Sequence, residues 1–193
     1  MGEVIKEGNL KIMFSAPHSA DHLRKGKIKP KEINTDTLVK ELFTLKDVSI
    51  IYKTESTDED ANWDKECLYK TKCKEIITKN DINIFLDIHG MDYKREQDIC
   101  IGTANGRNIL GRTDIQTVLV DTFKEYGYKN ITVDKPFNAK NSNCMSSYVA
   151  RECNIPAFQI EINNKYRYEP CDECNLKNLI NCFCKIIDKI KAF

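Results

Sequence analysis

The side chains best suited to bind a metal ion or to move a proton lie in three short segments of this sequence. These segments are APHSADH (16–22), FLDIHG (85–90) and FQIEIN (158–163). They contain all three histidines of the chain, His18, His22 and His89. Each segment ends or follows an apolar run of the kind that forms a buried strand. Histidines scattered over a solvated surface would not be expected to cluster in this way.

The first two segments offer ligands for a zinc ion. A catalytic zinc site has three protein ligands, often imidazole and carboxylate groups, and one position left for water. The H-x-x-D spacing of His18 and Asp21 can bring both groups to one ion, and His89 can complete the set. Asp87 lies two residues before His89, so on a strand both side chains point to one face. Asp87 is therefore predicted to accept the imidazole N–H of His89 and fix its tautomer.

Glu161 lies in the apolar stretch AFQIEI, where a carboxylate is costly to bury without a partner or a catalytic role. The role that suits it is general base, which takes a proton from the attacking water and passes it to a leaving nitrogen. Simpler explanations exist for single residues. His22 alone resembles a structural strand-end histidine. A salt bridge to Arg151 or Lys165 would explain Glu161 alone as well as a catalytic role does. The three segments taken together favour a metal site.

The elements that must position these residues alternate along the chain. Apolar runs predict strands, and apolar residues spaced three or four apart predict helices. The predicted strands are 10–17, 48–53, 82–90, 98–103, 130–134 and 157–163. The predicted helices are 34–46, 62–79 with Asn62 as its cap, 112–127, 141–153 and 172–193.

This alternation predicts a three-layer α/β/α sandwich with a mostly parallel, mixed sheet. Several predicted strands are apolar on both faces, as expected for a sheet that helices cover on both sides. In such sheets, binding sites form at the carboxyl ends of the strands. The three segments with candidate site residues lie at those ends.

Bulk composition narrows the function classes. The chain has 193 residues, which favours one domain over 1–193, and a formal net charge of +1. That charge gives no general basic field to attract nucleic acid or an anionic membrane. No apolar run approaches the ~20 residues of a membrane span, and the N-terminus lacks the apolar core of a signal peptide. We therefore expect a cytoplasmic protein with a small-molecule substrate; the oligomeric state is not predicted.

Nine cysteines in a chain without a secretion signal predict reduced thiols. Four of them cluster late, as Cys171 and Cys174 in CDEC and as Cys182 and Cys184 in CFC. Two such pairs can in principle hold a structural zinc ion. The interpretation we favour is that Cys182 and Cys184 are partly buried helix positions, since a C-x-C pair on a helix points its sulfurs to different faces.

The order of these motifs resembles the zinc carboxypeptidase and aspartoacylase superfamily, and within it the N-formylglutamate amidohydrolase-like group. The stretches that carry the resemblance are APHSADHLRKGKIKPKE, DEDANWDKE, FLDIHG, DICIGT and SSYVARECNIPAFQIEIN, which span roughly residues 10–165. The resemblance implies one zinc ion on His18, Asp21 and His89, with Glu161 as base. It also implies a zinc-carboxypeptidase-like fold and hydrolysis of an amide next to a carboxylate, as in an N-acylated amino acid.

The sequence departs from the superfamily at the second ligand. Carboxypeptidases have glutamate where this chain has Asp21, and aspartate reaches less far. His22 therefore competes for the same role through an H-x-x-x-H arrangement, although we rank Asp21 first. The ligands would also accept cobalt, nickel or manganese.

Arginines are the residues expected to bind the substrate carboxylate and to stabilise an oxyanion, because the guanidinium group forms bidentate bonds. Arg24 and Arg95 follow the candidate ligands most closely in sequence and are preferred over Arg107 and Arg151. The leading hypothesis is a zinc-dependent amidohydrolase acting on a small N-acylated amino acid. The alternatives are a metallocarboxypeptidase acting on short peptides and a non-catalytic metal-binding protein that keeps the fold.

Overall fold

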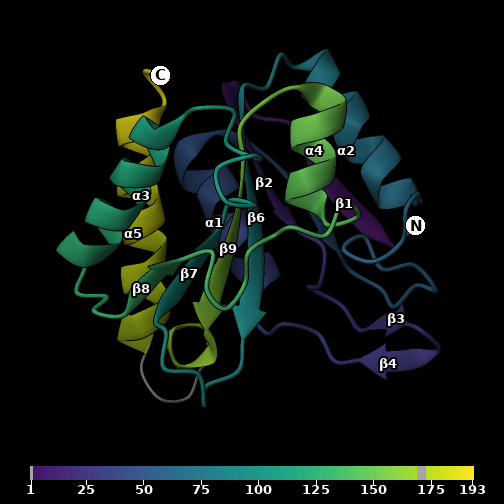
Figure 1. Ribbon diagram of the computed structural model, residues 1–193, viewed down its shortest axis with the longest axis horizontal. Coiled ribbons are helices and arrows are strands. Elements are labelled where there is room, and N and C mark those ends of the chain that lie inside the picture. The colour runs from purple at the N-terminus through teal and green to yellow at the C-terminus, as the bar shows by residue number, and fades with distance from the viewer. Residues whose placement is uncertain (1, 169–172) are drawn as a thin grey trace.

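A mixed β-sheet forms the middle layer of the computed structural model, which describes residues 2–168 and 173–193 (Figure 1). Its strands are β1 (Glu3–Lys6), β2 (Leu10–Ala16), β5 (Val48–Lys53), β6 (Ile84–Met91), β7 (Ile99–Gly102), β8 (Ile131–Val133) and β9 (Ala157–Asn163). The strand order is β1-β5-β2-β6-β9-β7-β8. The β1–β5 and β7–β9 pairs are antiparallel, and the other neighbours are parallel. The prediction of a mostly parallel, mixed sheet is therefore confirmed.

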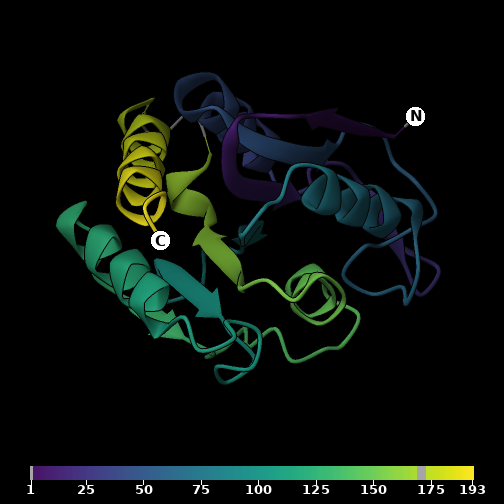
Figure 2. The ribbon, with the colours of Figure 1, turned by 90° about the horizontal axis from the view of Figure 1, so that it is seen from above.

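Helices cover both faces of this sheet. One face carries α1 (Thr35–Lys46), α3 (Thr113–Glu125) and α5 (Glu173–Ile190), and the other carries α2 (Leu68–Lys79) and α4 (Met145–Cys153). Figure 2 shows α3 and α5 on one side and α2 and α4 on the other. The three-layer arrangement predicted from the sequence is confirmed.

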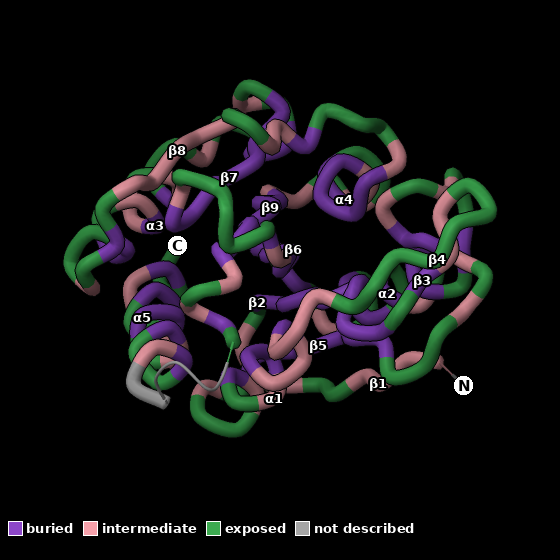
Figure 3. The backbone as a smooth tube through the Cα atoms, turned by 90° about the horizontal axis from the view of Figure 1, so that it is seen from below, coloured by how far each residue is buried: buried purple, intermediate pink, exposed green. Residues whose placement is uncertain are grey.

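Each strand divides its side chains between the two layers, because successive residues point to opposite faces. In β6, Ile84, Leu86 and Ile88 join the core under α1, α3 and α5, whereas Phe85 packs under α2 and α4. Strands β6 and β9 are buried along almost their whole length (Figure 3). Asp87 and His89 share the face of Phe85 and lie nearer the carboxyl end of β6, where the sequence predicts a binding site.

The helix predicted over 62–79 begins six residues later than expected, at Leu68. Asn62 does not cap it, because its side chain contacts His89 and accepts a hydrogen bond from the Met145 backbone N–H. Residues 60–67 instead form a loop with a turn at 61–63. Within this loop, the backbone N–H of Asp60 donates to Asp64 Oδ2, and that of Asn62 donates to Asp60 Oδ1.

Four short elements lie outside the expected strands and helices. One is β1, at the edge of the sheet. The others are a hairpin of β3 (His22–Arg24) with β4 (Lys27–Lys29), and the 3-10 helix η1 (Asn164–Tyr166) after β9. Among the residues described, no helix is both long enough and apolar enough to cross a bilayer.

The late cysteines divide between described and undescribed parts of the chain. Cys182 is buried beside the backbone of α3, with its Sγ 3.8 Å from the Thr122 carbonyl oxygen, and Cys184 is half-buried. Neither joins a metal-capable group within the described residues. Cys171 and the side chain of Cys174 lie outside them, so a zinc site there remains a hypothesis from the sequence.

Candidate metal centre

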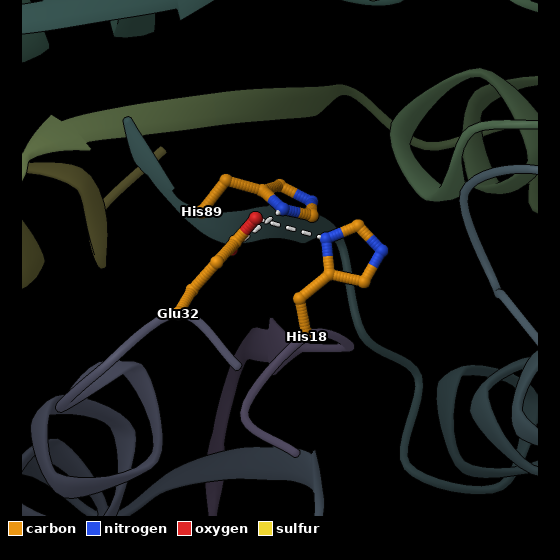
Figure 4. Close-up of side chains that lie close together, drawn as sticks. All are labelled: His18, Glu32 and His89. Carbon is orange, nitrogen blue, oxygen red and sulfur yellow. Dashed lines mark hydrogen bonds and ion pairs between the residues drawn. The ribbon is translucent and has the colours of Figure 1, made fainter. Parts of the chain in front are cut away.

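Three side chains from separate segments meet at one point: His18, Glu32 and His89 (Figure 4). His18 Nδ1 lies 3.0 Å from Glu32 Oε1, and His89 Nδ1 lies 3.1 Å from Glu32 Oε2. Their potential ligand atoms all lie within 4.8 Å of one another. Two imidazoles and one carboxylate are a donor set that zinc accepts.

Local structure explains how each of the three reaches this point. β2 ends at Ala16, and Pro17 and His18 form the turn that follows. The backbone N–H of Glu32 donates to the His18 carbonyl oxygen at 2.8 Å, which ties the loop after β4 to that turn. His89 lies near the carboxyl end of β6, and the N–H of Gly90 donates to Glu32 Oε2 at 2.9 Å.

The outer nitrogen of each imidazole meets a buried aspartate. His18 Nε2 lies 2.9 Å from Asp60 Oδ1, and His89 Nε2 lies 3.0 Å from Asp87 Oδ2. In zinc sites such carboxylates accept the imidazole N–H, fix the tautomer and leave the other nitrogen free for the metal. The structure thus places Asp87 beside His89 as the sequence suggested, and it adds Asp60 in the matching position on His18.

Charge also favours a cation at this place. Buried or half-buried carboxylates outnumber the nearby guanidinium groups; the acids are Glu32, Asp60, Asp87 and Glu161, and the cations are Arg24 and Arg167. Asp87 Oδ1 is buried and has no hydrogen-bond partner among the residues that the structure describes. Burying a carboxylate with few partners is costly unless a positive charge lies near. The residues present therefore fit a divalent metal ion.

Burial and charge act in opposite directions on the three candidate ligands. Burial favours the neutral imidazole, but the neighbouring carboxylates outweigh it and hold the pKa of His18 and His89 above the usual range. Burial also opposes ionisation of Glu32, yet the two imidazoles hold its pKa well below the usual value. Glu32 is thus an ionised carboxylate that faces two nitrogen donors.

Glu161 lies beside His89 on the neighbouring strand. The parallel register of β6 and β9 pairs the two residues, and both line a cleft of about 440 Å³ together with His18 and Glu32. Burial, with Glu32 and Asp87 nearby, raises the pKa of Glu161 to about 7, against the opposing effect of the imidazoles. The Gln159 amide donates to Glu161 Oε1 at 3.0 Å. A carboxyl group with this pKa is suited to accept and return a proton near neutral pH.

Arg167 lies behind the three candidate ligands and is almost fully buried, with 3% of its surface exposed. Its Nε donates to the Ile162 carbonyl oxygen at 3.1 Å, and its Nη1 donates to that of Ile33. The guanidinium group packs over Gly90, where a Cβ atom would lie only 2.2 Å from Nη2. Glycine at this position thus allows the arginine to connect the end of β9 with the loop that carries Glu32.

Asp21 is placed away from the three converging side chains. It is exposed, and its Oδ1 accepts a hydrogen bond of 2.8 Å from the backbone N–H of Lys31. The carboxylate that lies between His18 and His89 is that of Glu32, whereas the sequence had predicted Asp21 for this position. The contact between Asp21 and Lys31 fixes the residue just before Glu32, which explains how an H-x-x-D turn marks the site without providing its carboxylate.

His22, the alternative to Asp21, packs against the ring of His18. The two rings are stacked with centroids 4.0 Å apart, and His22 Nε2 lies 3.8 Å from Asp60 Oδ2. His18, His22 and Asp60 form a second group with metal-capable spacing. The Arg24 guanidinium already donates to Asp60 Oδ2, however, so this group has its own cation.

Both preferred arginines line the cleft. Arg24 Nε donates to Asp60 Oδ2 at 2.5 Å, whereas Arg95 is exposed and lies over the Phe137 ring at 5.3 Å. Arg107 and Arg151 instead line a separate cavity of about 330 Å³.

The loop residues Glu32, Asp60 and Asn62 are absent from the site inferred from the motifs. Glu32 sits in the lysine-rich stretch KIKPKE, and Asp60 sits in the acidic stretch TDEDANWD. Both stretches are typical of solvated surface. Both stretches belong to the segments that carry the family resemblance, but the resemblance implies no role for Glu32 or Asp60.

Comparisons with known proteins show the fold. No family model matches the sequence, and no curated protein matches it by sequence. A crystal structure of N-formylglutamate amidohydrolase from Ralstonia eutropha is similar over 99% of this chain and 98% of that chain, with 12% identity and a TM-score of 0.72. A bacteriophage poly-γ-glutamate hydrolase covers 100% of this chain and 89% of its own, with 14% identity and a TM-score of 0.62. The chain therefore has the zinc-carboxypeptidase-like fold of these N-formylglutamate amidohydrolase and poly-γ-glutamate hydrolase structures.

A metallo-carboxypeptidase from Burkholderia cenocepacia is similar over 92% of this chain and 56% of that chain, with 14% identity and a TM-score of 0.54. The larger enzyme thus shares the sheet and its helices but extends well beyond them.

Proposed function

We propose that this chain is a zinc-dependent amidohydrolase that cleaves an amide bond in a small N-acylated amino acid. The zinc ligands in this proposal are His18, Glu32 and His89, and Glu161 is the general base. The observation that carries the proposal is the convergence of two imidazole Nδ1 atoms and an ionised carboxylate beside a buried glutamate, in one cleft.

A zinc ion held by these three residues would supply Lewis-acid chemistry toward the substrate carbonyl and a water molecule. Glu161 takes a proton from the attacking water and returns it to the leaving nitrogen. Gln159 holds the Glu161 carboxylate through the bond to Oε1. Asp60 and Asp87 keep the two imidazoles in the tautomer that presents Nδ1.

The cleft supports a substrate that carries a carboxylate. Its basic lining residues are Arg24, which lies on the β3–β4 hairpin, Arg95 and Lys140. A guanidinium group binds a carboxylate through two parallel hydrogen bonds. The names of the similar structures, an N-formylglutamate amidohydrolase and a poly-γ-glutamate hydrolase, agree with amide hydrolysis next to a carboxylate.

Metal content and hydrolysis measured on the same preparations test this proposal. The purified protein should contain one zinc ion per chain and release the amino acid from N-acyl-L-glutamates. The variant Glu161→Gln should keep zinc and lose roughly 10²- to 10⁴-fold in kcat, the range for a lost general base. His89→Ala should lose both zinc and activity.

Two outcomes favour the alternative functions. Faster release of a C-terminal residue from short peptides than of an acyl group from N-acyl-glutamates would identify a metallocarboxypeptidase. Zinc at full stoichiometry with no hydrolysis of either substrate type would identify a non-catalytic metal-binding protein. Stoichiometric zinc in His89→Ala would contradict the assigned metal site.

A further inference from the structure

A cavity of about 330 Å³ lies apart from the cleft, between the loop that follows β7 and helix α4. It shares no lining residue with the cleft, and nothing in the proposed mechanism uses it. Its volume is at the lower end of the range of ~300–1,000 Å³ that small-molecule sites occupy. We call it the arginine cavity, because Arg107 and Arg151 line it together with the aliphatic side chains of Leu110 and Ala150.

The arginine cavity carries positive charge, and none of its lining residues is acidic. Within the described part of the chain, Arg107 donates only to the Lys140 carbonyl oxygen and forms no ion pair. Arg151 Nε donates to Glu152 Oε1 at 2.9 Å, but Glu152 does not line the cavity. A guanidinium group binds a carboxylate or phosphate through parallel hydrogen bonds, so two of them at one cavity are suited to hold an anion.

The buried wall of the arginine cavity is already formed without a ligand. Asn108 and Ser147 are both buried, and Asn108 Nδ2 lies 3.0 Å from Ser147 Oγ. Both side chains also donate to the Ala139 carbonyl oxygen, at 3.2 and 2.7 Å. These polar groups are therefore paired within the protein. A ligand that enters a wall fixed in this way loses less free energy to the ordering of side chains.

Residues 138–144 border both the arginine cavity and the cleft. Ser142 lines the cavity, whereas Lys140 is one of several residues of this segment that line the cleft. The two arginines of the cavity bind the backbone of the same segment. Arg107 Nη2 donates to the Lys140 carbonyl oxygen at 3.3 Å, and Arg151 Nη1 donates to that of Ser142 at 3.0 Å. The segment is therefore held from the side of the cavity.

The same segment holds the loop that carries the cleft residues Asn62 and Trp63. Asn141 Nδ2 donates to the Asn62 carbonyl oxygen at 3.3 Å, and Asn143 Nδ2 donates to that of Trp63 at 2.9 Å. Asn62 Nδ2 in turn lies 2.8 Å from His89 Nε2. A shift of the segment would therefore be felt in the cleft and at a candidate metal ligand.

We propose that the arginine cavity binds a small organic anion, a carboxylate or phosphate group on an apolar body, and that the bound anion alters the cleft through residues 138–144. The anionic group binds the two guanidinium groups, and the apolar body lies against Leu110 and Ala150. The anion competes for these guanidinium groups with the two carbonyl oxygens of the segment, so the hold on the segment weakens. This inference does not depend on the reaction that takes place in the cleft.

Calorimetry with matched probes tests the binding. Cyclohexanecarboxylate and cyclohexyl phosphate carry both features, cyclohexanecarboxamide lacks the charge, and acetate lacks the apolar body. The better of the two cyclohexyl anions should bind with a Kd of about 1 mM or tighter, and it identifies the preferred anionic group. The carboxamide and acetate should bind at least about tenfold more weakly. No measurable binding of either cyclohexyl anion, or equal binding of the carboxamide, would overturn the proposal.

A carboxylate placed in the wall of the cavity locates the bound anion. Ser142 is exposed, so Ser142→Glu should fold, and its carboxylate should pair with the arginines and weaken anion binding at least about tenfold. Ser142→Gln has the same size without the charge and should bind like the wild type. Arg107→Gln should also weaken binding, whereas Arg112→Gln removes an arginine that does not line the cavity and should not. Unchanged binding by Ser142→Glu and Arg107→Gln would place the anion elsewhere and overturn the proposal.

The one tryptophan of the chain, Trp63, reports the effect on the cleft. It lines the cleft, and Asn143 connects its carbonyl oxygen to the segment. Its fluorescence should change as the cyclohexyl anion is added, with the same Kd as calorimetry gives, and Ser142→Glu should abolish the change over the same concentrations. Binding in calorimetry without any change in Trp63 fluorescence would contradict the proposed effect on the cleft.

Discussion

The polar cluster of the candidate metal centre has two halves that are held in different ways. The strand half consists of Asp87 and His89 on β6 and Glu161 on β9, fixed by the parallel register of the sheet. The loop half consists of Glu32 and Asp60, which lie on segments outside the sheet. The two halves meet at His18, in the turn after β2, which contacts Glu32 and Asp60 and lies with its ring 4.8 Å from that of His89.

Individual side-chain contacts hold the loop half. Two buried lysines are prominent: Lys53 Nζ donates to the Glu59 carbonyl oxygen at 2.8 Å, and Lys70 Nζ donates to that of Asn143 at 2.6 Å and to that of Asp64. Asp21 and His18 hold the backbone just before and at Glu32. The strand half therefore depends on sheet register, whereas the loop half depends on polar contacts. The residues that make those contacts lie in polar stretches that are typical of a solvated surface.

The largest effect expected in a comparison of the halves is on metal affinity. Asp60→Asn in the loop half and Asp87→Asn in the strand half should each weaken zinc binding by roughly 10- to 100-fold, the usual cost of losing a carboxylate behind a metal-binding histidine. Competition with a chromophoric chelator measures this affinity. Asp58→Asn, an exposed position on the same loop as Asp60, is the control and should bind zinc like the wild type. Unchanged affinity in Asp60→Asn alone would mean that only the strand half supports the metal.

The second effect concerns the contact that joins the halves. Gly90→Ala places a Cβ atom 2.2 Å from Arg167 Nη2, so the arginine must move and its bonds to Ile162 and Ile33 must weaken. We expect a loss of about 2 kcal/mol in the free energy of unfolding, within the range for overpacking. Urea denaturation measures it. On an Arg167→Met background the same substitution should cost clearly less, and equal costs in both backgrounds would show that the two residues are not coupled.

The third effect is a shift of the pH profile. Glu161 must be ionised to act as a base, so kcat/KM should fall as the pH drops through its pKa, which burial raises to about 7. Gln159→Leu removes a donor that favours the ionised form, so the acid limb should move to higher pH by about one unit. An acid limb that stays in place, or one that moves to lower pH, would show that Glu161 is not the group that titrates.

The fold and the strand half were predictable from sequence because both follow from local periodicity. The apolar runs of β2, β5, β6 and β9 are long, and their ends carry the histidines and Glu161 at alternating positions. The edge strand β1 and the β3–β4 hairpin are short and polar, so no apolar run marks them.

The loop half was not predictable from spacing. Glu32 reaches His18 only because the β3–β4 hairpin, His22–Lys29, folds back between them. Asp60 reaches His18 across 42 residues, with β5 and α1 in between. A carboxylate in a lysine-rich or acid-rich stretch carries no signal of burial, since such stretches are usually solvated.

The most direct test of this account is zinc binding by Glu32→Gln beside Asp21→Asn, measured by metal analysis after dialysis and by chelator competition. The two variants remove one negative charge each, from positions that compete for the same role. The account predicts that Glu32→Gln loses its zinc while Asp21→Asn keeps one ion per chain with nearly unchanged affinity. Retention of zinc by Glu32→Gln together with its loss from Asp21→Asn would contradict the proposed metal centre.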